Sequence, residues 1–453
     1  MSLRLQALSK RPVLAVAAFW YISLFPGRLP FDSSDAIRML QRGESTEQWT
    51  PLFFWLLKLF TIDGRVIYVS SFLIAIGFLY SFNYLVKSIS VPTEHLETKI
   101  LFWTSITPIY GFWSVTVSHD STFVIGFVMT IAILLRITSN QVITVRKREA
   151  LLAAVFLLTS WVGYVLCVIL LLSLFFLKYK NWLFVFVGVL LFASTAPLGI
   201  SSTRSDVIFR PFLVDMKCVV QHDEAVVSQQ TWQALQEIAP RERWENPVSC
   251  SSMDSAVHSL YSSTSNLSNL RWSKILPSYL QLLKDNPAIV IVGHIQRSSV
   301  ALPPILFQPP KNQVSWDLSL PVGFGTNTMI QQGPEVIHPS IDEKSVDINV
   351  PFQIYFEIPA QLLAFLVNQA SWFWGWGGLW IIPFIYLIHS RFALLGIRRL
   401  KFTYAQLLVF HLMMFALMPD PTPRYVLPSL LLGNFATVAL LVLRKSRLNQ
   451  PNP

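Results

Sequence analysis

Long apolar stretches separated by short polar or basic segments dominate the pattern of this chain. They lie at residues 12–25, 66–86, 100–117, 122–135, 150–177, 182–197, 378–388, 403–419 and 425–443. A helix of about 20 apolar residues crosses a bilayer, and shorter helices cross where they pair or tilt. The stretch 150–177 is too long for one straight span, and Trp161-Val162-Gly163 interrupts it, so we expect two short helices meeting at the outer face. The pattern predicts a mainly α-helical, polytopic bundle of about ten spans.

Basic clusters between the apolar stretches set the predicted orientation. They comprise Arg4, Lys10 and Arg11; Arg146, Lys147 and Arg148; Lys178 and Lys180; Arg391, Arg398, Arg399 and Lys401; and Arg444, Lys445 and Arg447. Loops rich in Lys and Arg stay in the cytoplasm, and ten spans place every cluster on that side. The first stretch has no A-x-A-like cleavage site, so we expect an uncleaved first helix. The sequence predicts a multi-pass cell-membrane protein with cytoplasmic N- and C-termini.

Two further apolar segments suit a membrane surface better than a span. Residues 51–62 form a stretch of about a dozen residues that holds Lys58 and precedes Asp63 and Arg65, which predicts an interfacial helix on the outer face. Residues 352–373, with Glu357 and many aromatics, predict another. The nearby Trp372, Trp374, Trp376 and Trp380 fit an interfacial aromatic belt, with sugar stacking as the alternative.

The chain divides into three predicted regions. Residues 1–198 form an N-terminal transmembrane catalytic module with an acidic external loop at 26–65, residues 199–352 form a large external α-containing domain or loop, and residues 353–453 hold an interfacial helix and the last spans. Cys218 and Cys250 lie in the external region, where oxidising conditions permit a disulfide, so we expect them to pair; two unpaired thiols are the alternative. Cys167 lies within a span.

Composition excludes a soluble class. The 453 residues are 53% hydrophobic and 13% charged, with mean hydropathy +0.49, whereas soluble domains carry about 25% charge. The net charge of +10 lies in the clusters that flank spans rather than in one basic stripe, so nucleic acid is not an expected partner. The sequence contains no repeat, no glycine-rich phosphate loop and no Cys/His spacing for zinc.

Polar residues with candidate chemistry gather at the predicted external ends of the spans. Asp32 and Asp35 share one face if their segment is helical, and they stand where membrane meets water. A helix cap and a solvated charge are the structural alternative. The turn Ser118-His119-Asp120-Ser121 is the second external polar segment, and Arg424 directly precedes the last span.

The order of these segments resembles the GT-C superfamily of integral-membrane glycosyltransferases. It consists of a first span, an acidic loop, an interfacial helix opening with Trp49-Thr50-Pro51-Leu52, two spans, the turn at 118–121, and a late Pro423-Arg424-Tyr425-Val426-Leu427-Pro428. The chain is similar in this respect to protein mannosyltransferases and to aminoarabinose transferases of lipid A. The match covers about the first 200 and the last 80 residues, and it rests on order and sidedness rather than on one specific motif.

The resemblance implies an enzyme that takes a sugar from a polyprenyl-phosphate donor and transfers it, with inversion, to a glycan, lipid or protein acceptor of the cell envelope. Asp32 best matches the catalytic base of the first loop. Ser33 follows it where the family often has Glu, which leaves Asp35 open as the base. Asp120 matches the second-loop acid, with His119 beside it. An Asp-x-Asp pair is absent there, so no metal or other cofactor is expected, although a divalent cation stays possible.

Transfer from a phosphate leaving group also needs a cation beside that phosphate. Arg424 is the first candidate because its guanidinium fork matches phosphate oxygens. Lys58 and Arg65 are weaker candidates, since cations at helix ends commonly snorkel.

Two other functions stay open. A transporter or flippase for lipid-linked saccharides would place ionisable groups near mid-membrane, where the predicted spans hold almost none besides His411. A non-catalytic scaffold for envelope assembly is the third possibility. We interpret His411 as a hydrogen-bond partner of a neighbouring helix, and His294 and Arg297 as surface residues on an amphipathic stretch.

Overall fold

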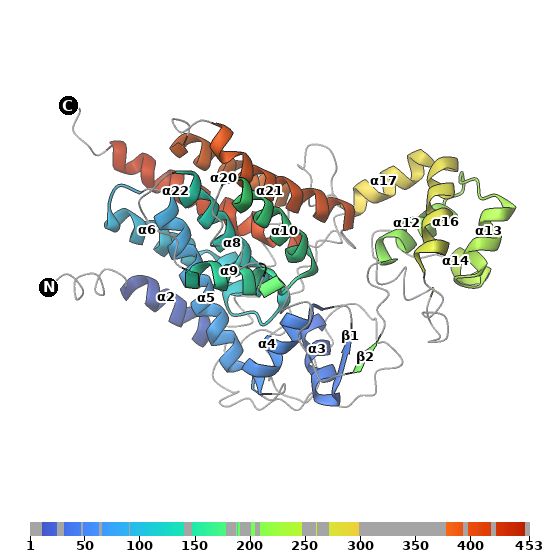
Figure 1. The fold of residues 1–453 in the computed structure, drawn as a ribbon, viewed down its shortest axis with the longest axis horizontal. Helices are drawn as coiled ribbons and strands as arrows, with labels where there is room; N and C mark the ends of the chain where they lie inside the picture. The colour runs from blue at the N-terminus through green and yellow to red at the C-terminus, as the bar shows by residue number, and fades with distance from the viewer. Residues whose placement is uncertain are drawn as a thin grey trace.

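The computed structural model of the chain describes residues 11–24, 31–46, 49–62, 66–89, 91–139, 147–177, 187, 189–190, 201–203, 209–246, 260, 271–298, 377–392, 397–417 and 423–448. Its described part is mainly α-helical, as the sequence predicts, and forms a large helical bundle and a smaller group of helices (Figure 1). The bundle consists of α2 (Arg11–Ser23), α5 (Tyr68–Ser88), α6 (Glu94–Ile106), α7 (Pro108–Ser114), α8 (His119–Thr138), α9 (Lys147–Leu157), α10 (Trp161–Phe176), α20 (Gly377–Phe392), α21 (Ile397–Leu417) and α22 (Leu427–Leu448).

Shorter elements complete the fold. Beside the bundle lie α3 (Phe31–Arg42), α4 (Pro51–Thr61), the 3-10 helix η5 (Pro423–Val426), and the strands β1 (Glu44–Thr46) and β2 (Ser201–Thr203). The two strands pair in parallel with Glu44 opposite Ser201. The smaller group, here called the middle unit, comprises described residues of 209–298: α12 (Arg210–Val220), α13 (Gln229–Gln236), α14 (Arg241–Glu245), α16 (Trp272–Asp285) and α17 (Pro287–Arg297).

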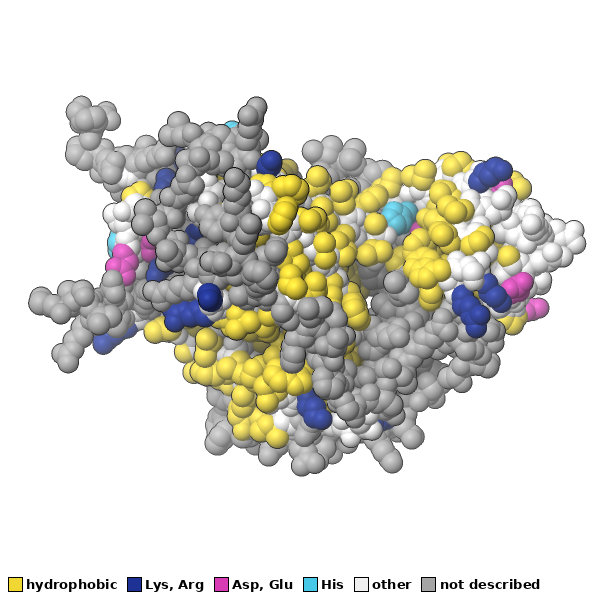
Figure 2. Space-filling view, in the orientation of Figure 1, with side chains coloured by type: hydrophobic (Ala, Val, Ile, Leu, Met, Phe, Trp, Pro, Cys, Tyr) yellow, Lys and Arg dark blue, Asp and Glu magenta, His cyan; other side chains and the backbone are white. Residues whose placement is uncertain are grey.

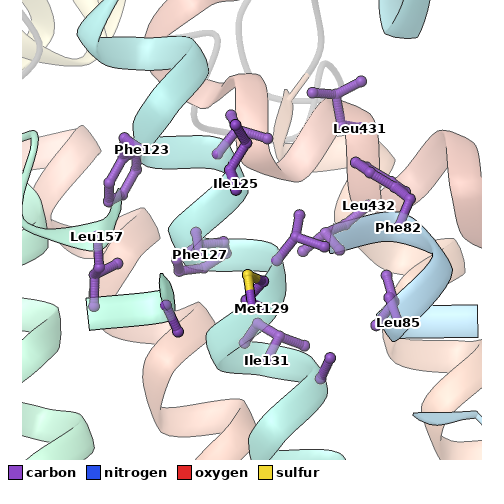
Figure 3. Close-up of a cluster of buried hydrophobic side chains, with 14 of the residues drawn as sticks. Phe82, Leu85, Phe123, Ile125, Phe127, Met129, Ile131, Leu157, Leu431 and Leu432 are labelled. Carbon is purple, nitrogen blue, oxygen red and sulfur yellow. The ribbon is translucent and has the colours of Figure 1, made fainter. Parts of the chain in front are cut away.

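Helix α8 is the centre of the bundle. Every residue from 121 to 138 in it is buried. Figure 3 shows the enclosing side chains: Phe82 and Leu85 from α5, Leu157 from α9, and Leu431 and Leu432 from α22. A helix that is apolar on all sides is stable only when other apolar groups cover each side, and these helices supply that cover.

Four of the described helices are long and apolar enough to cross a membrane. They are α5, α8, α21 from Leu400 to Leu417, and α22 from Leu427 to Ser446. α2, α10 and part of α20 are apolar but shorter. The predicted total of about ten spans stays a prediction, because the stretch 182–197 lies almost wholly outside the described residues.

The predicted span at 100–117 is wrong as one continuous helix. The structure has two helices there, α6 and α7, which divide at Thr107. Thr107 has extended backbone angles (φ −64°, ψ 136°) because the ring of Pro108 disfavours the α conformation at the residue before it. By contrast, α9 and α10 are separate helices on either side of residues 158–160, as the interruption at Trp161 predicts.

Contacts between helix ends agree with the predicted alternation of sides. At ends predicted to be external, the Ser71 hydroxyl of α5 donates to the carbonyl of Val115 (3.0 Å), and Thr122 of α8 bonds to Thr159, just before α10 (2.9 Å). At ends predicted to be cytoplasmic, Arg391 of α20 donates to the carbonyl of Ile89 (3.2 Å). Figure 1 shows α2 beginning and α22 ending at the same end of the bundle. Which end faces the cytoplasm stays a prediction.

A buried polar network secures the predicted cytoplasmic end. Arg136 of α8 is 4% exposed, and its Nε donates to the hydroxyl of Ser88 (2.8 Å). Its guanidinium lies 3.6 Å from the ring centroid of Tyr84, and the Tyr84 hydroxyl donates to Glu149 of α9 (3.1 Å). A buried charge is tolerated only when such partners replace water. The network therefore joins α5, α8 and α9.

Side chains on the outside of the bundle are apolar over a wide area. Figure 2 shows this surface as a broad yellow zone. Large exposed side chains occur on five of the surrounding helices: Phe19 and Ile22 of α2, Phe72 and Ile76 of α5, Val165, Val168 and Leu172 of α10, Ile382 and Ile385 of α20, and Leu408 and Leu412 of α21. Soluble monomers rarely expose so much contiguous apolar surface, and lipid is the solvent that it suits.

The middle unit has a hydrophobic cluster of its own. Its centre includes Leu213, Trp244 and Leu282, each fully buried. Cys218 on α12 is disulfide-bonded, whereas Cys167 on α10 is a buried free thiol. Cys250 lies outside the described residues, as does the predicted interfacial helix at 352–373, so the Cys218–Cys250 pairing stays a prediction. The position of this unit outside the membrane also stays a prediction.

Helices α8 and α9 approach so closely at Gly126 that the position has no room for a side chain. A Cβ atom at this position would overlap the backbone of Phe156 and Leu157. We expect Gly126→Ala to lower the free energy of unfolding by about 1–3 kcal/mol, because the helices must move apart. Gly293→Ala is the matched control, since a Cβ there meets no atom within 4 Å. Thermal unfolding in detergent measures both, and equal melting temperatures for the two variants would contradict the prediction.

Candidate functional site

The candidate site begins at the N-terminus of α8. Ser118 has an extended backbone (φ −150°, ψ 160°), and its hydroxyl accepts a hydrogen bond from the backbone N–H of Ser121 (3.0 Å). This cap satisfies one of the amide groups that the first turn of a helix leaves free. It fixes His119 and Asp120 in the first turn, where the helix dipole favours a negative charge.

His119 and Asp120 form a close pair that water and ligands can reach. The His119 Nε2 lies 3.3 Å from an Asp120 carboxylate oxygen, and the side chains are 24% and 17% exposed. The ring of Phe53 from α4 meets the imidazole edge-on, with 5.7 Å between centroids. Because a carboxylate accepts hydrogen bonds, Asp120 favours a proton on Nε2 and leaves Nδ1 of the neutral ring as an acceptor. Nδ1 is buried and has no partner among the described residues.

Other buried polar atoms without a described partner lie on α7, on α3 and just before α4. The indole N–H of Trp113 on α7 is buried and unbonded in the described part of the chain, and the Trp113 carbonyl accepts from the hydroxyl of Ser121 (3.2 Å). The indole N–H of Trp49, just before α4, and the hydroxyl of Ser33 on α3 are also buried without a described partner. Native proteins leave few buried donors unpaired, so these atoms are candidate ligand contacts.

Asp32 and Asp35 lie on a helix. This is the condition under which residues three apart share one face. Both belong to α3, whose buried stripe consists of Ser33, Ala36, Ile37 and Leu40. At 100° per residue, Asp32 and Asp35 lie about 60° apart on the helix, with Asp32 at the edge of this stripe and Asp35 nearly opposite it. α3 contacts α4, which carries Phe53 against His119. The structure therefore brings the first acidic segment and the second external turn to the same end of the bundle. The side chains of both acids lie outside what is described.

Lys58 belongs to a different face of α4. The helix 51–61 exists as the sequence predicts, and five of its apolar residues are buried in the core, so it packs against the bundle. Lys58 is exposed, and it lies roughly 140° around the helix from Phe53 at 100° per residue. The structure does not bring Lys58 to the His119 pair. Arg65 lies outside the described residues.

Arg424 is placed by its backbone. It lies in η5, directly before α22. Phe410 of α21 packs against Phe123 in the second turn of α8 (6.0 Å between centroids), and His411 bonds to the hydroxyl of Ser429 in α22 (2.9 Å). The bond from His411 to a neighbouring helix confirms its sequence interpretation. These contacts put η5 at the same end of the bundle as His119, while the Arg424 side chain is not described.

His294 is not the surface residue that the sequence suggests. Its side chain is 18% exposed, and Nδ1 lies 3.1 Å from a carboxylate oxygen of the buried Asp215 on α12. Its Nε2 lies 3.0 Å from the carbonyl of Phe415 in the last turn of α21. Both ring nitrogens therefore join the middle unit to the bundle, which is a structural task. The side chain of Arg297 lies outside the described residues.

Lys217 is another buried titratable group in the middle unit. Burial lowers the pKa of its ammonium from 10.5 to about 8. Shifted pKa values often mark functional sites, but this ammonium donates to the carbonyl of Arg243 on α14 and so links two helices. Within the described residues, no group of three or more His, Cys, Asp or Glu side chains is arranged to hold a metal.

The contribution of the Ser118 cap to stability can be measured without an activity assay. We expect Ser118→Ala to lower the free energy of unfolding by about 1 kcal/mol, because the amide of Ser121 loses its acceptor. Ser160→Ala is the matched control, since Ser160 begins α10 with an extended backbone but its side chain caps no amide. Thermal unfolding in detergent compares the two. A control as unstable as Ser118→Ala would contradict the role of the cap.

Comparisons of the chain with protein-family models, with curated proteins and with solved structures find no match in any of the three.

Proposed function

We propose that the chain is an integral-membrane glycosyltransferase that uses a polyprenyl-phosphate-linked sugar as donor. One observation carries the proposal. Helix α3, with Asp32 and Asp35, contacts α4, and α4 places Phe53 against the His119–Asp120 pair. Helices that carry acids about 85 residues apart in sequence are thus linked through α4 at one end of an apolar bundle. That is the arrangement which the GT-C resemblance implies.

The proposed reaction assigns one task to each group. Asp32 or Asp35 accepts the proton of the acceptor hydroxyl while the oxygen of that hydroxyl attacks the anomeric carbon of the sugar. The bond from that carbon to the phosphate oxygen breaks, and polyprenyl phosphate leaves with the bonding electrons. Because attack and departure occur on opposite faces, the configuration inverts. Arg424 holds the departing phosphate with its guanidinium.

His119 and Asp120 have a positioning role in this proposal. Asp120 orients the imidazole through Nε2, and the unpartnered Nδ1 accepts a hydrogen bond from a sugar or acceptor hydroxyl. The indole N–H groups of Trp49 and Trp113 are further donors for hydroxyl or phosphate oxygens. The lipid-facing apolar helices around the bundle give the prenyl chain a surface of matching chemistry.

Sugar transfer by the purified chain in detergent or nanodiscs tests the proposal. A panel of radiolabelled polyprenyl-phosphate sugars is offered to wild type, Asp32→Asn, Asp35→Asn and Arg424→Ala at matched folded amounts. We expect one Asp variant to lose transfer by on the order of 100-fold or more while still binding donor, because it lacks the base. Glu94→Gln, an exposed acid at the start of α6, is the control and should transfer normally.

Two outcomes would contradict the proposed glycosyltransferase activity. One is a wild type that transfers no sugar from the panel although it binds lipid-linked sugar, with all variants binding equally. Flux of that lipid across vesicles would then favour a carrier, and its absence a scaffold. The other is full activity in both Asp variants, which would remove the proposed base.

The His119–Asp120 pair predicts a separate effect. We expect Asp120→Asn and His119→Ala to reduce transfer, because the imidazole loses its orientation or is removed. For Asp120→Asn the free energy of unfolding should change by less than about 1 kcal/mol, since a partly exposed polar pair contributes little. Donor titrations that separate KM from kcat, with melting curves, measure both. Loss of transfer that only tracks loss of folded protein would assign the pair a structural role.

A further inference from the structure

The outer face of α17 consists of apolar side chains. The helix carries no charged residue from Pro287 to Gln296. Val290 and His294 face inward, while Ile291 and Val292 are 50% and 46% exposed. A surface helix of a soluble domain normally presents polar or charged groups to water. This face is therefore built for a different environment.

Helix α16 continues the same surface. Trp272, Leu276 and Leu280 recur every four residues and are all exposed, so they form one stripe along the helix. A different stripe of the helix, with Ile275 and Leu282, belongs to the core of the middle unit. α16 and α17 contact each other, and Figure 2 shows exposed hydrophobic side chains over both.

The position of this surface follows from its link to α21. His294 and Ser298 both bond to the carbonyl of Phe415, at 3.0 and 2.7 Å. The apolar length of α21 runs from Leu400 to Leu417, 18 residues, or about 27 Å at 1.5 Å per residue, which matches a hydrocarbon core of about 30 Å. The last turn of α21, and α17 with it, therefore lies at the boundary between hydrocarbon and headgroups.

The apolar surface is also continuous with the lipid-facing side of the bundle. Leu412 and Leu417 on the outer part of α21 are exposed. Figure 2 shows the hydrophobic zone of the bundle passing on to α17 and α16. Exposed cations stand at the two ends of α16, Arg271 before it and Lys284 in its last turn. Apolar side chains flanked by cations are the composition of helices that rest in a membrane interface.

We propose that the α16–α17 face of the middle unit rests on the lipid bilayer. Trp272, Leu276, Leu280, Ile291 and Val292 insert among the lipids at headgroup depth, and Arg271 and Lys284 meet anionic headgroups. The middle unit then lies on the membrane instead of projecting into water. This inference needs the chain to be a membrane protein but does not depend on the reaction that it catalyses.

Nitroxide labels on the full-length chain test this contact. Single cysteines are placed at Leu280 and Ile291, with Leu412→Cys on α21 as the lipid-exposed reference and Gln233→Cys on the polar face of α13 as the aqueous reference. Cys167 is changed to Ala, and the disulfide-bonded Cys218 is left intact. The protein is reconstituted in phosphatidylcholine bilayers containing phosphatidylglycerol. Collision rates with oxygen, which concentrates in lipid, and with a neutral nickel complex, which stays in water, are compared.

If the face contacts lipid, the collision rate with oxygen exceeds the rate with the nickel complex at positions 280 and 291, as it does at position 412. At position 233 the nickel complex gives the higher collision rate. Collision ratios at 280 and 291 equal to that at 233 would overturn the proposal, because the face would then be in water. Exclusion of both reagents would also overturn it, because a second copy or another segment would then cover the face. Leu280→Cys and Ile291→Cys lie on separate helices and are exposed, so misfolding of one variant leaves the other as a test.

Discussion

Complete enclosure of α8 is the constraint on which the bundle depends. The helix is apolar on every side, so each side needs a neighbour at van der Waals distance. Gly126 lets the backbone of α9 approach, Phe127 packs on Phe410 of α21 at 5.0 Å between centroids, and α5 and α22 cover the remaining faces. Lipid has no preference for its own tails over Leu side chains, so close packing rather than the hydrophobic effect holds such helices together. The two ends of α8 are consequently fixed points.

The two ends of α8 differ in whether their buried polar groups have hydrogen-bond partners. At one end, the Arg136 guanidinium is satisfied by Ser88, the Tyr84 carbonyl and the Tyr84 ring. At the other end, Nδ1 of His119 and the indole N–H of Trp113 are buried without a partner among the described residues. A satisfied buried group stabilises the fold, whereas an unsatisfied one costs about 1–3 kcal/mol until something binds it. This asymmetry makes the His119 end, rather than the Arg136 end, the candidate for a ligand site.

Local signals in the sequence were enough to predict most helices but few of their partners. Apolar length predicts α5 and most of α8, although α8 begins at His119, inside the segment predicted as a polar turn. The break between α6 and α7 was not predicted, although a proline at position 108 indicates that a helix ends before it. His294 was misread because its partners lie 79 and 121 residues away, at distances along the chain that no periodicity reveals. In the candidate site, order along the chain indicated Asp32 or Asp35 and Asp120 as functional acids, and these roles stay predictions. The unpaired indoles of Trp49 and Trp113 emerge only from packing.

The outer part of α21 connects the candidate site with the middle unit. Phe410 touches α8, His411 bonds to α22 beside η5, and the Phe415 carbonyl receives His294, all within six consecutive residues. A middle unit that rests on lipid through α16 and α17 would lie beside the His119 end in the plane of the membrane, because its attachment is lateral to the helix axis. The proposed prenyl-linked donor would arrive along that same plane. In the proposed reaction, the acceptor hydroxyl would then meet the donor at headgroup depth, where partial dehydration strengthens the interaction of a carboxylate with the proton that it removes.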